Sequence, residues 1–367
     1  MTSQLFSSAK LRGLTLNNRI VVSPMAQYQA KDGNVNDWHL MHYGSLSMGA
    51  AGLVISEMTD VSEVGRVSYE CAGLYNDDNE AAWKRIVDFV KAKGVAKFGV
   101  QLGHAGRKGS TVPPAKDGLP LTEEQGAWET IAPSAIPFAE TWHTPREATT
   151  EDMAEIKQQF VDAVIRADRV GFDLVELHAG HGYLINQFLS PITNRRTDEY
   201  GGSLENRMRF PLEVFEAMRA AWPEDKPMGA RVSATDWVEG EGFTPEEATQ
   251  LALELKTRGI EYVDISGGGL DPRQKPPFGV AYQASMAEQV RAGADITTMT
   301  VGLIADPHVA EDLIASGKTD FVKIAREALY NPRWAWHAAV ELGEETQYPG
   351  GYFAAQPKFR PWVFQKS

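Results

Sequence analysis

Short apolar segments with high β propensity recur along this chain, separated by stretches with helical periodicity. Eight such segments occur: RIVVSPM, GLVISEM, KFGVQLG, LVELHAG, MGARVS, YVDISGG, ITTMTVG and FVKIARE. Their apolar residues are nearly continuous instead of alternating, which is typical of parallel strands buried on both faces. Eight strand–helix alternations favour a closed (β/α)8 TIM barrel of the α/β class over a doubly wound open sheet.

Helix signals lie between the predicted strands. Thr244-Pro245-Glu246-Glu247 combines an N-cap threonine, a proline in the first turn and a reciprocal glutamate, which predicts a helix start. Asp306-Pro307 and Asn331-Pro332 predict two further helix starts. Because barrels of this type often exceed the usual domain length, we expect one domain over residues 1–367.

Two segments fall outside the strand–helix repeat. Residues from about 107 to 148 form a long Pro- and Gly-rich insertion after the third strand, and residues from about 343 to 367 form an aromatic C-terminal tail. A structureless loop of this length is usually functional. We expect the insertion to act as a lid, because the loops at the carboxyl ends of the strands carry the active site in such barrels.

Composition excludes several partners and kinds of site. The net charge of −13 and the lack of a Lys/Arg-rich run disfavour nucleic acid. No apolar run approaches the length of a membrane span and no leader pattern opens the chain, so we expect a cytoplasmic protein without a membrane partner. Cys71 is the only cysteine, which excludes an internal disulfide, a Cys-ligated iron–sulfur cluster and a thiolate zinc site.

Polar residues that follow the predicted strands should meet at one barrel mouth. The densest group is His178, His181 and Tyr183, after the fourth strand. Two imidazoles and a phenol can direct hydrogen bonds into one small volume, which suits an oxygen on which charge develops. A metal site would need a third ligand such as Glu176, and satisfied core histidines are the other alternative. We predict an oxyanion clamp and no metal.

Arg231 and Gln101 should reach inward from buried strands. An unpaired guanidinium in the core is costly, so Arg231 needs an anionic or carbonyl-rich partner. Glu176 could be that partner in a structural ion pair, or a cofactor ring with an anionic reduced form could be, and the residues alone leave both open. After the last two strands, Gly302 and Ala325-Arg326 lie where barrels commonly bind phosphate.

These stretches resemble the Old Yellow Enzyme family over nearly the whole chain. The matching segments are residues 18–25, 101–107, 178–183, 194–207 and 302–304, and the 194–207 loop is close to a family signature. Tyr28, Asp37-Trp38-His39 and the His-x-x-His-x-Tyr pattern are similar to the bacterial, xenobiotic-reductase-like branch.

The resemblance implies a non-covalently bound FMN and a ping-pong ene-reductase. Hydride would pass from NAD(P)H through FMN to the β-carbon of an enone, enal, maleimide or nitroalkene. His178 and His181 would bind the activating oxygen, Tyr183 would give a proton to the α-carbon, and Tyr28 would line the substrate pocket. Gln101 and Arg231 would contact the pyrimidine side of the flavin. The full implied set of FMN contacts is Ser23, Pro24, Met25, Ala26, Met58, Gln101, Arg231, Gly302, Ala325 and Arg326.

The tail is the implied subunit contact. In the same branch an arginine and a tryptophan of the tail complete a neighbour's site, and Arg360-Pro-Trp362 looks similar. The resemblance therefore implies Arg360 and Trp362 as substrate-binding residues in a homodimer or homotetramer.

Other functions on the same barrel are alternatives. A flavin-dependent dehydrogenase or dienoyl-CoA-type reductase would carry a Cys-ligated cluster and an extra nucleotide domain, which the single Cys71 and the nearness of the barrel to the chain's end disfavour. A non-catalytic flavin-binding protein would not need Tyr183. An aldolase would need a lysine at a strand end, where only Lys323, within the last strand, comes near.

Three residues depart from the pattern of the branch. Ala26 replaces the usual cysteine beside the flavin, Met58 replaces a small residue, and Ala325 replaces the glycine before Arg326. Ala26 can neither donate a hydrogen bond nor form a redox-sensing thiol. Met58 and Ala325 narrow the space near the flavin or its phosphate, where the implied cofactor has to approach the backbone closely.

We expect Ala26→Cys to raise the reduction potential of the bound flavin, because the thiol restores a hydrogen-bond donor beside it. Redox titration of the two proteins measures the shift. An unchanged potential would contradict the donor argument.

Overall fold

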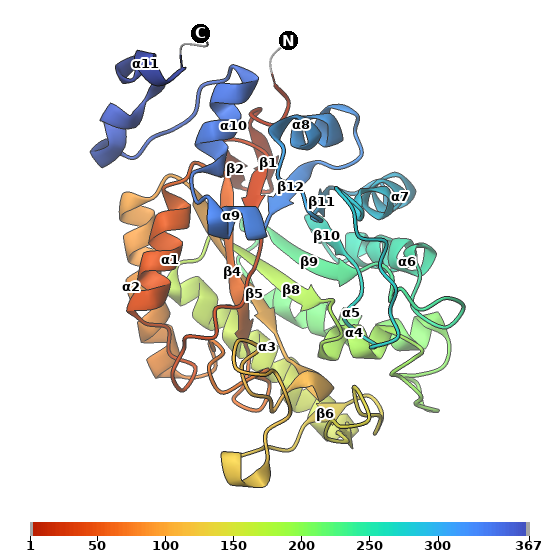
Figure 1. Ribbon diagram of the computed structural model, residues 1–367. Coiled ribbons are helices and arrows are strands. Elements are labelled where there is room, and N and C mark those ends of the chain that lie inside the picture. Colours follow the sequence, from red (N-terminus) through yellow and green to blue (C-terminus); the bar gives the residue numbers. More distant parts are fainter. Residues whose placement is uncertain (1–2, 365–367) are drawn as a thin grey trace.

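Eight parallel strands close into a barrel in a computed structural model that describes residues 3–364 (Figure 1). Around the barrel the strands follow the order β10-β11-β12-β3-β4-β5-β8-β9. They are β3 (Ile20–Val22), β4 (Leu53–Asp60), β5 (Lys97–Gly103), β8 (Leu174–Ala179), β9 (Met228–Ser233), β10 (Tyr262–Ser266), β11 (Thr298–Thr300) and β12 (Phe321–Ile324). Each predicted segment contributes one strand, so the predicted (β/α)8 barrel is confirmed.

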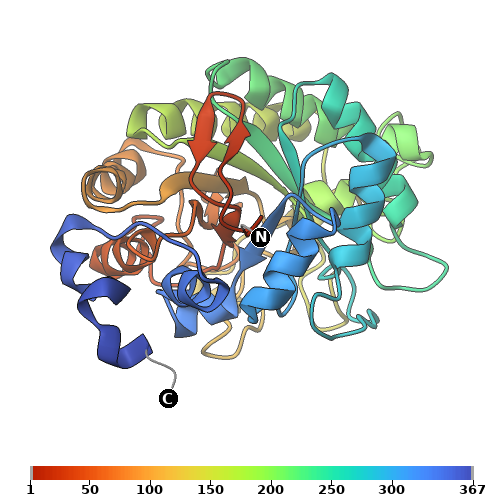
Figure 2. The same ribbon diagram turned by 90° about the horizontal axis from the view of Figure 1, so that it is seen from above.

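Helices surround the barrel on the outside, as the view in Figure 2 shows. They are α1 (Asp37–Ser47), α2 (Asp77–Lys93), α3 (Thr150–Val170), α4 (Leu184–Leu189), α5 (Leu204–Ala221), α6 (Pro245–Thr257), α7 (Ala284–Ala294), α8 (Pro307–Ala315), α9 (Arg326–Tyr330) and α10 (Trp334–Leu342). Within residues 3–364, none is both long and apolar enough to cross a lipid bilayer.

Of the three helix starts predicted from a capping residue followed by proline, two are confirmed. Thr244 Oγ1 accepts from the Glu247 amide in a capping box at the start of α6, and Asp306 caps α8. The third prediction is wrong in position, because Asn331 ends α9 and its side chain accepts from the Arg333 amide. Helix α10 therefore begins only at Trp334.

Apolar side chains fill the amino-terminal half of the barrel, and polar ones fill the half near the mouth. The apolar cluster includes Leu53, Leu174 and Phe321, together with Leu11 and Leu16 from a hairpin that the sequence pattern did not reveal. That hairpin pairs β1 (Ala9–Leu11) with β2 (Leu14–Leu16) in antiparallel fashion. Closing this end with apolar residues leaves the carboxyl ends of the strands as the open end.

The insertion leaves the barrel after β5 and returns to α3. It contains the 3₁₀ turns η1 (Gly106–Lys108) and η2 (Glu123–Gln125) and the short strands β6 (Ile131–Ala132) and β7 (Arg146–Glu147), which pair in parallel. In Figure 1 it lies at the bottom of the view, where β6 is labelled.

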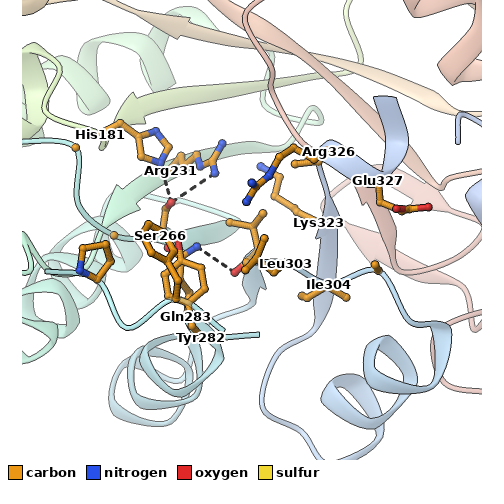
Figure 3. A pocket seen from close by; sticks show the side chains of 18 of the residues that line it. His181, Arg231, Ser266, Tyr282, Gln283, Leu303, Ile304, Lys323, Arg326 and Glu327 are labelled. Carbon is orange, nitrogen blue, oxygen red and sulfur yellow. Dashed lines mark hydrogen bonds between the residues drawn. The ribbon is translucent and has the colours of Figure 1, made fainter. Parts of the chain in front are cut away.

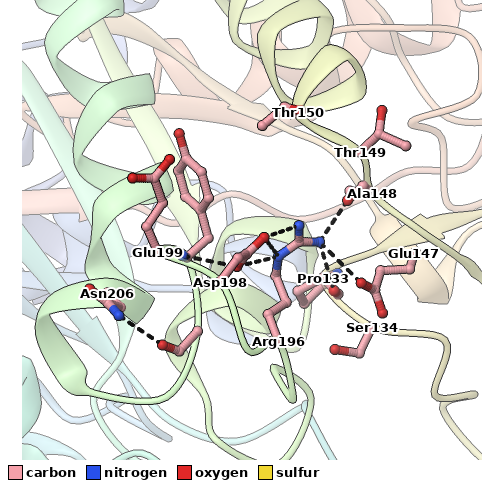
Figure 4. A network of polar contacts seen from close by, with 12 residues as sticks. Pro133, Ser134, Glu147, Ala148, Thr149, Thr150, Arg196, Asp198, Glu199 and Asn206 are labelled. Atoms are coloured by element: carbon pink, nitrogen blue, oxygen red, sulfur yellow. Dashed lines mark hydrogen bonds and ion pairs between the residues drawn. The ribbon is translucent and has the colours of Figure 1, made fainter.

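Arg196, in the 194–207 loop, fastens the end of the insertion (Figure 4). Its guanidinium donates to the carbonyl oxygens of Ala148 at 2.6 Å and Pro133 at 3.2 Å. Asp198 Oδ1 lies 3.0 Å from Arg196 Nε and orients the guanidinium. Because this arginine side chain is only 7% exposed, its contacts gain from a low local dielectric.

The tail packs beside α10. It contains η3 (Gly350–Ala355), η4 (Pro357–Phe359) and α11 (Pro361–Phe364). The rings of Trp336 and Tyr348 lie 4.7 Å apart, and the Arg333 guanidinium lies 5.4 Å from the ring centre of Tyr352. In Figure 1, α11 lies at the upper left, at the end of the molecule opposite to β6.

We expect Arg196→Ala to lower the local opening free energy of residues 131–148 by about 2 kcal/mol, because it removes charge-assisted hydrogen bonds to two backbone carbonyls. Native-state hydrogen exchange of these amides measures the change. Arg195→Ala is the matched control, since Arg195 is exposed and its side chain has no hydrogen bond or ion pair to any residue from 3 to 364, while its backbone amide donates to Ser134 Oγ. Equal exchange in both variants would show that Arg196 does not anchor the insertion.

Candidate active site

A cavity of about 600 Å³ opens at the carboxyl ends of β9 to β12. Its walls are the loop after β10 from Gly267 to Gln283, the loop after β11 from Val301 to Ala305, and the start of α9. Arg231 and Lys323 lie at its floor, and Figure 3 shows them with Arg326 around the same space. This volume is in the range of small-molecule and cofactor sites.

Four charged side chains form a buried network at the floor of the cavity. Arg231 Nε lies 3.0 Å from Asp264 Oδ2, and Lys323 Nζ lies 2.6 Å from the same oxygen. Lys323 Nζ also contacts Glu176 Oε2 at 2.9 Å. The sequence left Glu176 open as one possible partner of Arg231, but the carboxylate that pairs with it is Asp264, which stands directly beside Arg231 in the β9–β10 register.

Gln101 belongs to the same network. Its Nε2 donates to Glu176 Oε1 at 2.8 Å, and the Tyr262 hydroxyl donates to Glu176 Oε2 at 3.0 Å. Gln101 and Glu176 are register partners on β5 and β8. Gln101 and Arg231 thus both point into the barrel, as predicted, and each is held by a buried carboxylate.

His178 and His181 form a hydrogen-bonded chain at the cavity edge. The Gly180 amide donates to His178 Nδ1 at 3.3 Å, so the proton of His178 belongs on Nε2. His178 Nε2 lies 3.2 Å from His181 Nδ1, and His181 Nε2 lies 2.7 Å from Ser266 Oγ. One assignment satisfies the chain: each imidazole is neutral and carries its hydrogen on Nε2.

Burial lowers the pKa of both imidazoles well below the usual histidine range, and the Arg231 guanidinium adds to the effect. Both side chains are therefore neutral at pH 7, and each has one N–H to donate.

Tyr183 lies against His178, as the spacing of the motif predicts. The two ring centres are 5.2 Å apart in an edge-on arrangement. Burial, and then the neighbouring Tyr28, raises the pKa of the Tyr183 phenol, so the phenol keeps its proton.

Lys108, which the sequence patterns did not single out, lies over Tyr183. Its Nζ is 5.1 Å from the ring centre of Tyr183 and donates to the carbonyl oxygens of His181 at 2.9 Å and Gly269 at 2.8 Å. Burial, followed by the charge of Arg107, lowers the pKa of Lys108 to about 8.

The predicted phosphate-binding residues lie around the far part of the cavity. Gly302 has φ +134°, and a Cβ there would come 3.0 Å from the Tyr282 ring, so the position suits glycine. Arg326 is exposed, and within the described residues its side chain has no hydrogen bond or ion pair. Ala325 has φ −111°, which is outside the left-handed region that favours glycine.

The segment after β3 forms another wall of the mouth. Ser23 is buried and its Oγ accepts from Arg231 Nη1 at 3.3 Å. Pro24 and Met25 are half-buried and Ala26 is exposed. Tyr28 has φ +51°, an uncommon backbone for tyrosine.

Glu57, next to Met58 on β4, holds this segment in place. It accepts from the Gln27 amide at 2.8 Å and from the Tyr43 hydroxyl at 3.0 Å. Met58 lies against Gly103, where a Cβ would come 2.6 Å from the methionine sulfur. Met58 thus packs toward β5 and is 8% exposed.

Two predicted site residues lie in the tail. Arg360 is half-buried beside η4, and the side chain of Trp362 lies outside the part that the structure describes. No group of three metal-binding side chains occurs among the described residues.

Sequence reasoning missed Asp264 and Ser266, and it considered Lys323 only as a candidate for Schiff-base chemistry. A signal existed, because residues at every second position of a strand share a face, and Asp264 and Ser266 follow one another at that spacing on β10. A pattern of inward-facing polar residues does not reveal which of them pair across the barrel.

A family model described as "NADH:flavin oxidoreductase / NADH oxidase family" matches residues 4–345. An NADPH dehydrogenase of Geobacillus sp. (strain WCH70) is 42% identical over 358 residues, which cover 96% of this chain and 99% of that protein. This chain belongs to that flavin oxidoreductase family, the Old Yellow Enzyme family.

Solved structures extend the similarity. Morphinone reductase in complex with tetrahydroNAD matches with a TM-score of 0.76 and 31% identity, over 95% of this chain and 93% of that chain. A 2-naphthoyl-CoA reductase matches with a TM-score of 0.84 and 26% identity, over 93% of this chain and 52% of that chain. Old Yellow Enzymes bind FMN, so this chain is an FMN-dependent oxidoreductase with NAD(P)H as hydride donor.

The donor set of the cavity fits FMN. Buried Arg231 offers positive charge to a ring that becomes anionic on reduction, and exposed Arg326 offers it to a phosphate. Gln283 Oε1 is buried without a hydrogen-bond partner within the described residues. A bound polar molecule could satisfy such a group.

We expect His104 to make the protein less stable in acid. Its Nδ1 accepts from the Gly106 amide at 3.0 Å, and burial lowers its pKa to about 4. Between about pH 6.5 and about pH 4 the unfolded chain therefore binds a proton that the folded one does not, and the free energy of unfolding falls with pH by about 3 kcal/mol in total.

Denaturant unfolding across this pH range, compared between the native protein and His104→Asn, measures the contribution. Asparagine can still accept from Gly106, but it does not titrate. The variant should show a shallower pH dependence by about one proton. Identical slopes would contradict the assignment.

Proposed function

We propose that this protein is an ene-reductase that reduces the C=C bond of electron-poor alkenes: enones, enals, maleimides and nitroalkenes. The observation that carries the proposal is the cluster of His178, His181 and Tyr183, which lies beside a cavity with a buried guanidinium at its floor. Two neutral N–H donors next to a protonated phenol suit a substrate that has an activating oxygen at one end and needs a proton at the other.

FMN supplies the hydride chemistry when it is bound. We assign its pyrimidine side to Gln101 and Arg231 and its phosphate to Gly302, Ala325 and Arg326. The backbone from Ser23 to Ala26, with Met58 behind it, would line its central ring. Positive charge from Arg231 favours a ring that gains negative charge.

His178 and His181 bind and orient the substrate in this proposal. The Gly180 amide holds the His178 tautomer with its hydrogen on Nε2, which faces His181 Nδ1. A substrate oxygen would take the place of His181 Nδ1 as the acceptor for His178, and of Ser266 as the acceptor for His181 Nε2–H. Both donors then draw electron density from the double bond, which makes its β-carbon more electrophilic.

Tyr183 gives its phenolic proton to the α-carbon. The raised pKa keeps this proton in place until carbanion character develops on the substrate. Lys108 lies over the ring face and would stabilise the phenolate that remains until solvent restores the proton. Tyr28 contributes a wall of the same pocket.

The insertion and the tail would complete the site. We assign the insertion the role of a lid, supported by Arg107, which donates to the carbonyls of Pro137 in the insertion and Leu270 at the mouth. The tail bears exposed Phe353 and Phe359, 59% and 46% accessible, which suits a subunit contact that brings Arg360 and Trp362 to a neighbour's mouth.

The direct test is anaerobic oxidation of NADPH by the purified yellow protein, with cyclohexenone or a maleimide as acceptor. Saturated product should form in step with NADPH loss. A protein that contains FMN and oxidises NADPH but reduces none of these alkenes would refute the proposal.

The subunit contact is tested separately, by comparing Phe353→Ser with the native protein in sedimentation equilibrium.

We expect Tyr183→Phe to slow alkene reduction about 100-fold or more, because the proton donor is lost, while NADPH still reduces the flavin at a nearly native rate. Stopped-flow absorbance separates the two half-reactions. An equal loss in both would mean that Tyr183 positions the flavin or the nicotinamide instead of donating a proton.

A further inference from the structure

Lys323 is a buried cation that the proposed reaction does not use. It lies on β12 at the floor of the cavity, and its side chain is fully buried. Its Nζ contacts Glu176 Oε2 at 2.9 Å and Asp264 Oδ2 at 2.6 Å. A fully buried lysine held by two carboxylates is not available as a nucleophile, so a Schiff-base role is ruled out by its surroundings.

The two carboxylates that hold Lys323 are also those that hold the proposed flavin contacts. Glu176 accepts from Gln101 Nε2 at 2.8 Å, and Asp264 pairs with Arg231 at 3.0 Å. Lys323 therefore links the support of Gln101 to the support of Arg231, across the barrel from β8 to β10. Figure 3 shows Lys323 beside Arg326 at the same cavity as Arg231.

The charges in this network balance. Lys323 and Arg231 contribute two positive charges, and Glu176 and Asp264 two negative ones, all with side chains 0–7% exposed. Without Lys323 the four-residue network would carry one net negative charge beneath the cavity, with Arg231 as its one remaining cation. In a site shielded from solvent, such a charge acts strongly on a group a few ångströms away.

We propose that Lys323 is a positioning and tuning residue for the flavin: its charge offsets Glu176, so that the field of Arg231 favours the reduced, anionic ring. This inference rests on the proposed placement of the flavin in the cavity. The flavin takes up two electrons and one proton, as delivered by the hydride of NAD(P)H, and so gains one negative charge. A network with no net charge does not repel this added charge.

The test is the two-electron reduction potential of the FMN-loaded protein, titrated with dithionite against a reference dye. Lys323→Met should lower the equilibrium constant for reduction at least tenfold, about 30 mV. Glu176→Gln removes one negative charge and should raise the reduction potential. The double variant Lys323→Met/Glu176→Gln is again balanced and should return close to the native value. Lys318→Met, which removes an exposed lysine, is the matched control and should leave the potential unchanged.

The order of potentials decides the question even if Lys323→Met alone does not fold. Glu176→Gln and the double variant then differ only in Lys323, and a higher potential in Glu176→Gln supports the inference. Equal potentials in these two variants, or a shift in Lys318→Met as large as in Lys323→Met, would overturn it. Because the titration needs neither NADPH nor an alkene, failure of alkene reduction would refute the proposed function without affecting this result.

Discussion

Burial of four charged side chains inside the barrel mouth is the constraint on which the rest of the site depends. A buried ion pair is tolerable only when its partners meet with good geometry, because an uncompensated charge in the core costs several kcal/mol. Here the partners come from β8, β9, β10 and β12, so only a closed barrel in this register brings them together. The network gives Arg231 and Gln101 one orientation each, with both side chains directed inward.

The same network acts on the histidines through Ser266. This hydroxyl lies 2.7 Å from His181 Nε2 and 3.5 Å from Arg231 Nη2, so it connects the histidine pair to the charged network. Burial lowers the pKa of both histidines, and the positive charge of Arg231 lowers it further because it disfavours protonated imidazoles. With the flavin placed as we propose, one cation would serve two needs: it would favour an anionic ring, and it adds to the burial that keeps His178 and His181 neutral.

Sequence alone predicted the barrel and most residues at its mouth, because both follow from local patterns. Continuous apolar runs mark the strands, and the motif from His178 to Tyr183 places three donors within one turn of chain. The pairing of Arg231 with Asp264 depends on the register between β9 and β10, which no local pattern contains. The role of Arg196 is equally non-local, since it binds carbonyls about fifty residues earlier in the chain.

Arg107 and Lys108 connect the insertion to Tyr183, the proposed proton donor. Arg107 holds the carbonyls of Ile136 and Pro137, while Lys108 holds that of His181 and covers Tyr183. His181 has φ +56°, a backbone that costs a histidine free energy unless its surroundings enforce it, and the ammonium bound to its carbonyl is one such enforcement. The start of the insertion is therefore part of the support of the cluster of His178, His181 and Tyr183. Order in the insertion and alignment of the two imidazoles with the phenol depend on the same short turn.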